Sequence, residues 1–181
     1  MTTSPSHPDP SEARGLSRPS RVQWWRRPFS ADPWRRTLYV LLALPLGLAS
    51  LPLVLLGRDQ TAARLQRDLA RRYLALRIDQ PAARRTAGRV LAHAVLGLPL
   101  NLVSLALVVY LWLLVFANLA YPLRPDTMDS YQHSWGGPTL AGAWAVHAAG
   151  GLVFLFVAPW IIEAVTRLQG GLARRLLGTG A

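Results

Sequence analysis

The chain has 181 residues, of which 51% are hydrophobic and only 16% charged, and its 20 basic residues, all arginine, outnumber 9 acidic ones for a net charge of +11. Because it contains no cysteine, a disulfide framework and a cysteine-based zinc site are excluded. The apolar content excludes a wholly disordered chain, and charged residues are scarcer than in soluble domains, where they make up about a quarter.

Residues 1–27 are predicted to form a disordered tail with a basic, aromatic end. The first 20 residues are rich in Ser and Pro and show no hydrophobic periodicity. Trp24, Trp25 and Trp34 then alternate with arginines. Because aromatic rings prefer the lipid headgroup region and Arg is attracted to anionic lipid, we expect these tryptophans to anchor the chain at a membrane surface. Nucleic acid is not an expected partner, since the same residues flank an apolar segment.

The charged residues leave three long uncharged stretches between them. A helix needs about 20 apolar residues to cross a hydrocarbon core of roughly 30 Å. The stretches hold 21 residues between Arg36 and Arg58, 34 between Arg89 and Arg124, and 33 between Asp129 and Glu163. We therefore predict an all-α integral membrane protein in which residues 93–118 and 139–162 are two full transmembrane helices.

The distribution of arginine predicts how these helices are oriented. Short cytoplasmic loops are enriched in Lys and Arg, and the arginines are concentrated in residues 1–37, 57–92 and 163–181. The segment 121–138 carries one Arg and two Asp, so we place it outside. The prediction is a multi-pass protein of the cell membrane with both termini in the cytoplasm.

The first apolar segment, residues 38–56, has two interpretations. A single crossing would put the N-terminus outside, opposite the Arg-rich segment 57–92. Pro45 and Pro52 each remove a backbone donor and clash with the preceding turn, so they can divide the segment into two short arms. We favour such a helical hairpin or re-entrant segment with both ends inside. The alternative is a third span kinked by proline, which spanning helices tolerate.

An internal repeat relates residues 28–76 to residues 89–178. LPLGLASL at 44–51 matches LPLNLVSL at 98–105, and RLQ-x-x-LARR-x-L occurs at 64–74 and again at 167–177. Each copy of the second motif places leucines at helical spacing among arginines, which predicts an Arg-rich amphipathic helix in the membrane interface. Its predicted anchors are Arg71, Arg72, Arg174 and Arg175. Alternatively, each helix packs on a neighbouring helix or on a second copy of the chain in a homodimer.

Few polar residues are placed to recognise a ligand. Asp126, Asp129 and His133 lie in the outside loop, where one helical turn could point Asp129 and His133 at a divalent ion. The simpler interpretation is a solvated loop, and we predict no metal site and no cofactor.

His147 and Asn101 lie within the two spans, where polar side chains face protein rather than lipid. We expect a hydrogen bond between them, and both remain candidates for ligand sensing.

The sequence contains none of the common catalytic motifs. There is no G-x-S-x-G, no H-E-x-x-H and no Gly-rich phosphate loop, and Glu12 and Glu163 are the only glutamates. We therefore do not expect an enzyme.

Several motifs together resemble a known family. They are the entry Pro28-Phe29-Ser30, the repeated Leu-Pro-Leu segment, WGGPTLAGAW at 135–144 and LARRLLG at 172–178. Over residues 28–178 the chain resembles the sensor domain at the N-terminus of actinobacterial-type two-component histidine kinases. The resemblance implies a non-catalytic membrane sensor that feeds a cytoplasmic histidine kinase or other signalling partner. Because kinase motifs are absent, we expect a stand-alone sensor unit, or one whose kinase was lost or is a separate polypeptide. The alternative function is that of a small structural or scaffolding membrane protein.

Overall fold

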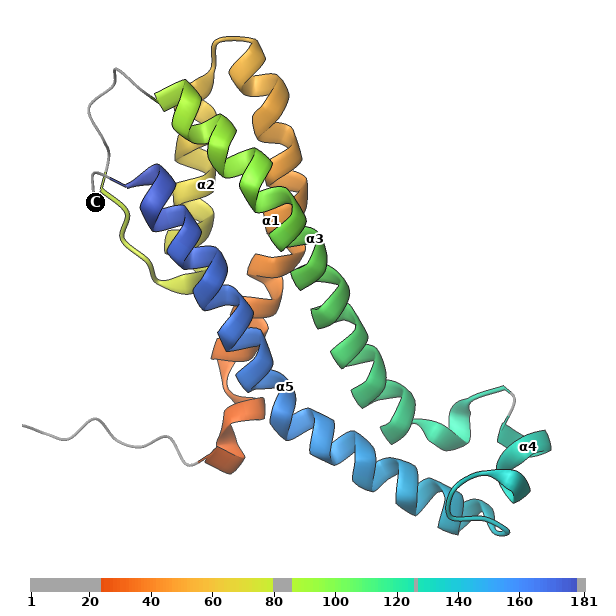
Figure 1. Ribbon diagram of the computed structural model, residues 1–181. Coiled ribbons are helices and arrows are strands. Elements are labelled where there is room, and N and C mark those ends of the chain that lie inside the picture. The colour runs from red at the N-terminus through yellow and green to blue at the C-terminus, as the bar shows by residue number, and fades with distance from the viewer. Residues whose placement is uncertain (1–23, 80–85, 126, 179–181) are drawn as a thin grey trace, which may run out of the picture.

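The computed structural model describes residues 24–79, 86–125 and 127–178, so the predicted tail at 1–23 lies outside this part. Every regular element in the described ranges is helical (Figure 1). The elements are η2 (Trp24–Phe29), α1 (Ala31–Leu55), α2 (Asp59–Leu74), α3 (Thr86–Leu119), η4 (Tyr121–Leu123), α4 (Thr127–Ser130), η5 (Tyr131–His133) and α5 (Leu140–Leu177), where η denotes a 3-10 helix. Three of them, α1, α3 and α5, are long and apolar enough to cross a membrane.

Helix α1 runs without interruption through the first apolar segment. Pro45 and Pro52 lie inside it, so the prediction that they divide residues 38–56 into a hairpin or re-entrant segment is wrong. Both prolines are on the exposed side of the helix, whereas Val40 and Gly47 are buried. Each proline removes one backbone hydrogen bond, but the packing of the opposite face holds the helix together. By length and composition, α1 fits the alternative of a third span.

Helix α2 folds back along α1. The turn between them holds Gly57 at a φ of 70°, a left-handed conformation that glycine adopts without steric cost. The Arg58 N–H donates to the carbonyl oxygen of Leu53 over 2.8 Å and closes the end of α1. Further along, Gln66 Nε2 donates to the hydroxyl of Ser50 over 2.9 Å. The first Arg-rich motif therefore packs on protein, and the helical hairpin of this region consists of α1 and α2 together.

Helices α3 and α5 lie antiparallel and are longer than the predicted spans. At about 1.5 Å per residue, their 34 and 38 residues extend over roughly 50 and 57 Å. Each contains one predicted span, 93–118 or 139–162. The second Arg-rich motif continues α5 without a break to Leu177, so the prediction that it forms a separate helix is wrong.

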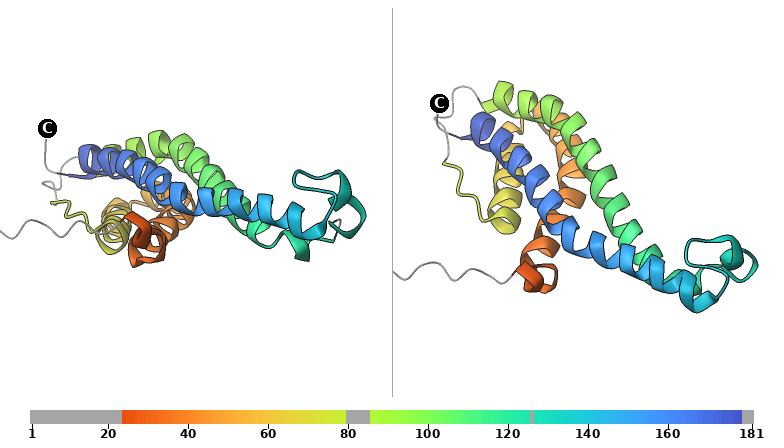
Figure 2. Two further views of the ribbon diagram at one scale, coloured as in Figure 1. Left: turned by 90° about the horizontal axis from the view of Figure 1, so that it is seen from below. Right: turned by 60° about the horizontal axis from the view of Figure 1, so that its bottom comes forward.

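The two ends of the α3–α5 pair differ in their surroundings. The α1–α2 hairpin lies beside the half that contains Thr86 and Leu177, and the connecting loop extends beyond it at the other end (Figure 2). The main core joins Val40 of α1, Val108 of α3 and Ile162 of α5, all fully buried. Within the described residues, one half of the molecule is a four-helix assembly, and the other half is the α3–α5 pair with its loop.

Residues related by the repeat make corresponding hydrogen bonds. Arg35 Nη2 donates to the carbonyl oxygen of Arg72 at the end of α2 over 2.6 Å. Its counterpart Arg89 donates from Nε to the carbonyl oxygen of Leu176 at the end of α5 over 2.8 Å. A guanidinium group at a helix C-terminus satisfies free carbonyls and opposes the helix dipole. Since α1 and α3 run in opposite directions, the two sets of bonds lie at opposite ends of the four-helix half (Figure 1).

Candidate sensing site

The loop end of α5 is fixed by an aromatic contact to the segment after α3. The ring of Tyr121 stacks on the imidazole of His147 with a centroid separation of 3.9 Å, and its hydroxyl donates to Ser134 Oγ over 2.7 Å. Nδ1 of His147 lies 2.8 Å from the carbonyl oxygen of Ala143, which only accepts, so Nδ1 carries the proton. Trp144 donates from Nε1 to another backbone carbonyl, at the end of α3, over 3.1 Å. These contacts bind the loop to α5 and the start of α5 to the end of α3.

A close backbone contact at the start of α5 explains the glycines of the WGGP segment. Gly136 has a φ of 91°, and a Cβ atom placed on it would lie 2.3 Å from the carbonyl oxygen of Gly142. A Cβ on Gly142 would in turn lie 2.2 Å from the carbonyl oxygen of Gly136. Only residues without a side chain allow this approach. The Thr139 side chain accepts from Gly142 N over 3.1 Å and caps the helix.

Of the three predicted loop ligands, the structure describes the side chain of His133 alone. Asp126 lies outside the described residues, as does the side chain of Asp129. Asp129 belongs to α4, which ends at Ser130, whereas His133 is exposed in the 3-10 helix that follows. That Asp129 and His133 point at one divalent ion stays a prediction. Among the described residues, no group of three or more His, Asp or Glu side chains could hold a metal ion.

Asn101 forms a buried polar junction between three helices. Its Nδ2 donates to the carbonyl oxygen of Ala43 in α1 over 3.3 Å, and its Oδ1 accepts from Gln169 Nε2 in α5 over 2.9 Å. Asn101 and Gln169 are 7% and 2% exposed, and Gln169 Oε1 is buried without a partner among the described residues. The predicted hydrogen bond between Asn101 and His147 is wrong, because His147 lies toward the loop and stacks on Tyr121.

Sequence reasoning missed Gln169 as the partner of Asn101. The signal that could have found it is the glutamine of the repeated RLQ motif. Gln66, at the same place in the first copy, also donates to a polar side chain of an apolar helix, Ser50. A glutamine at a fixed place in both copies is a candidate to pair with the polar residue of the apolar segment.

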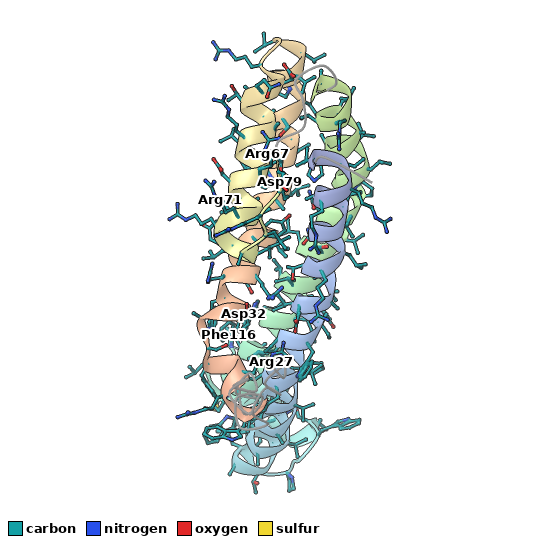
Figure 3. All side chains as sticks on the ribbon, turned by 90° about the vertical axis from the view of Figure 1, so that its left-hand side faces the viewer. Arg27, Asp32, Arg67, Arg71, Asp79 and Phe116 are labelled. Carbon is teal, nitrogen blue, oxygen red and sulfur yellow. The ribbon has the colours of Figure 1, made fainter. Side chains whose placement is uncertain are left out.

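Arg27 and Glu163 form an ion pair at the end of the uncharged part of α5. Arg27 donates from Nη2 to Glu163 Oε2, and Arg167 donates to Oε1 of the same carboxylate. The side chain of Glu163 is 12% exposed, and the Arg27 guanidinium lies 4.0 Å from the ring centroid of Trp160. Figure 3 shows Arg27 and Asp32 near the N-terminal end of α1, at the level of Phe116. The pair joins η2 to α5, although sequence reasoning did not single it out.

The predicted tryptophan anchors differ in their surroundings. Trp25 is about half exposed and lies against the guanidinium of Arg26, whereas nothing is described of the Trp24 side chain. Trp34 stacks on Trp112 of α3 at 4.4 Å, so one of its faces belongs to the protein interior. Anchoring to lipid stays a prediction for all three.

The arginines predicted as anchors lie on the surface of the four-helix half. Arg71 pairs with Asp68 on α2, and Arg72 is also exposed (Figure 3 labels Arg71). Arg174 and Arg175 on α5 are exposed and have no ion pair among the described residues. Arg67, at a variable position of the first motif, is buried, and this burial lowers its pKa.

Comparison with protein families matches residues 46–177 to the family described as “Putative sensor”. The matched range includes the Asn101 junction, the loop and the whole of α5, and it covers well over half of the chain. The entry Pro28-Phe29-Ser30 lies outside it. No curated protein and no solved structure matches the chain.

Proposed function

The chain belongs to the family described as “Putative sensor”, and on this basis we propose that it is a membrane sensor module that relays a stimulus to a cytoplasmic signalling partner such as a histidine kinase. The observation that carries the proposal is the continuity of α5, which joins the loop at Leu140 to the Arg-rich end at Leu177 as one helix. Because α5 continues through Pro159 without a break, a displacement of its loop end is passed along the helix. Sensor membership points to a role without catalysis.

We place the loop between α3 and α5 outside the cell membrane, and the Arg-rich end of α5 with the α1–α2 hairpin on its cytoplasmic side. Because α1 lies beside α3 as far as Trp112, the predicted span 93–118 then enters the bilayer from its loop end and not over its whole length. Helix α2 packs along α1 and exposes Arg64, Arg71 and Arg72. An Arg at the centre of a bilayer costs about 2.5–3.5 kcal/mol, so α1 would carry several such charges into hydrocarbon if it crossed with α2 beside it. The exposed Leu41 and Leu48 of α1 face away from α2 and fit the surface of the inner leaflet.

The relay uses the contacts that connect α5 to the other helices. A change at the loop reaches α5 through the Tyr121–His147 stack. A shift of α5 then acts on the buried Gln169–Asn101 hydrogen bond, which connects to α1 through the carbonyl of Ala43. Such packed, hydrogen-bonded junctions favour discrete arrangements over continuous deformation. The result is a different presentation of the exposed arginines at the end of α5.

The test of this function is the phosphorylation state of response regulators in the cells that encode the chain. We expect deletion of the chain to change the phosphorylated fraction of at least one regulator, measured on phosphate-affinity gels. The wild-type chain should restore it, whereas His147→Ala at equal protein level should not. If deletion leaves every regulator unchanged under conditions that perturb the cell envelope, the relay is rejected in favour of the scaffolding alternative.

A further inference from the structure

Two cavities lie on either side of the Arg-rich end of α5. One, of about 110 Å³, we call the basic pocket. Its lining consists of Arg36, Thr166, Arg167, Gly170 and Arg174, with Leu74 and Leu76 at the end of α2. The other, of about 390 Å³, is lined by Leu100 of α3 and by Leu168, Gly171 and Leu172 of α5, with Arg167 and Arg175 at its edge, and we call it the apolar groove. Arg167 lines both, so its side chain lies between the two cavities.

The lining of both cavities is positively charged and contains no acidic residue. Asp32 pairs with Arg36, and Glu163 pairs with Arg167, but both carboxylates lie outside the linings. Arg174 has no ion pair among the described residues. The basic pocket therefore keeps an excess of guanidinium donors, which suit a phosphate-sized anion because they can bind its oxygens in pairs.

The two copies of the repeat differ in the two residues between RLQ and LARR, which in the second copy line the cavities. Arg67 and Asp68 stand between RLQ and LARR in the first copy, and Gly170 and Gly171 stand there in the second. Arg67 is 7% exposed and fills the space beside its helix. Gly170, at the place of Arg67, lines the basic pocket. Gly171, at the place of the exposed Asp68, lines the apolar groove, and a Cβ atom on it would meet nothing within 4 Å. The second copy thus has no side chain at these two places, and both of them line cavities.

We propose that the Arg-rich end of α5 binds an amphiphile with a phosphate headgroup and an acyl chain, of the anionic phospholipid type. The headgroup occupies the basic pocket, and the chain lies in the apolar groove on Leu100 and Leu168. The groove volume falls within the range of about 300–1,000 Å³ that is usual for small-molecule sites. The site begins beyond Glu163, where the uncharged part of α5 ends, which is the expected depth of lipid headgroups. The inference does not depend on the relay.

The first test measures lipid binding to the purified full chain in a non-ionic detergent by native mass spectrometry. Phosphatidylglycerol, phosphatidylcholine with the same chains, and inorganic phosphate are titrated separately. We expect saturable binding of phosphatidylglycerol that Arg174→Gln with Arg175→Gln weakens about tenfold or more. The control is Arg71→Gln with Arg72→Gln, the corresponding residues of the first copy, which should leave binding unchanged. Equal binding of both lipids, or equal losses in both double variants, would overturn the proposal.

The second test separates a lipid from free phosphate. Gly171→Leu fills the apolar groove without a backbone clash and should weaken phosphatidylglycerol binding about tenfold, because the chain loses its contact surface. Gly150→Leu, in equally open space on the loop side of α5, is the matched control and should have no effect. Thermal melting shows whether each variant is folded. If inorganic phosphate binds as tightly as the lipid, and Gly171→Leu changes nothing, the acyl-chain site is disproved.

Discussion

At the scale of single residues, the buried amide of Asn101 stabilises the packing of α1, α3 and α5 through its hydrogen bonds to Ala43 and Gln169. Asn101→Ala removes the acceptor of Gln169 Nε2 and leaves the glutamine amide buried without any partner. An unsatisfied buried polar group costs about 1–3 kcal/mol, whereas replacing both partners with apolar groups is nearly neutral. We therefore expect Asn101→Ala to lower the thermal stability in detergent more than Asn101→Leu combined with Gln169→Leu. A double variant at least as unstable as the single one would contradict this account of the junction.

The Arg27–Glu163 pair should contribute more than an ordinary surface ion pair. Its carboxylate is largely buried and accepts from two guanidinium groups. A double-mutant cycle of Arg27→Ala and Glu163→Ala should give a coupling free energy of about 1.5–3 kcal/mol, as for hydrogen bonds to charged groups. The same cycle for the exposed Arg71–Asp68 pair should give about 0–1 kcal/mol. Equal couplings in the two cycles would show that Arg27 does not hold η2 to α5.

The polarity of Asn101 and His147 within apolar stretches singles them out in the sequence. It does not predict which residue each of them contacts. Which residues meet depends on the offset between α3 and α5 and on the presence of α1, and neither can be derived from one helix alone. The actual partner of Asn101 lies beyond the predicted span, at Gln169 in the Arg-rich motif. Of the loop candidates, the structure describes only the His133 side chain, which is exposed.

At the scale of the elements, the existence and type of the long helices could be predicted, but not their ends. Charge-free stretches locate apolar helices because charges are excluded from hydrocarbon. They say nothing of where a helix stops once it leaves the apolar region, and α5 continues through its arginines to Leu177. The proline argument for residues 38–56 was local, and the packing of the buried face of α1 on its neighbours outweighed it.

A pair of adjacent glycines in α5 tests how closely α3 and α5 pack. A Cβ atom on Gly151 would lie 3.0 Å from Leu119 Cγ and 3.1 Å from Asn118 Cβ, whereas one on Gly150 would meet nothing within 4 Å. Gly151→Leu should therefore destabilise the protein by about 1–3 kcal/mol through overpacking. Gly150→Leu is the control and should leave the thermal midpoint almost unchanged. If both variants melt alike, the two helices are not in contact at this level.

At the scale of the whole molecule, the arrangement of the α1–α2 hairpin could not have been predicted from composition. Arginine counts indicate which segments share a side of the membrane, but they do not show that α2 packs along α1 or that both lie beside the Arg-rich end of α5. The position of this hairpin relative to the membrane decides whether the protein has two spans or three.

The homodimer also stays a prediction, to be tested by the molecular mass of the detergent-solubilised protein.

The central claim is that α3 and α5 cross the membrane while both ends of α1 stay inside, and labelling of single cysteines in intact cells tests it most directly. The chain has no native cysteine, so Ser30→Cys, Thr61→Cys and Ser130→Cys each introduce a unique thiol. We predict that a membrane-impermeant maleimide modifies only the thiol at position 130 until the cells are permeabilised, when all three react. Labelling of intact cells at position 30 but not at position 61 would show that α1 crosses the membrane and would contradict the account.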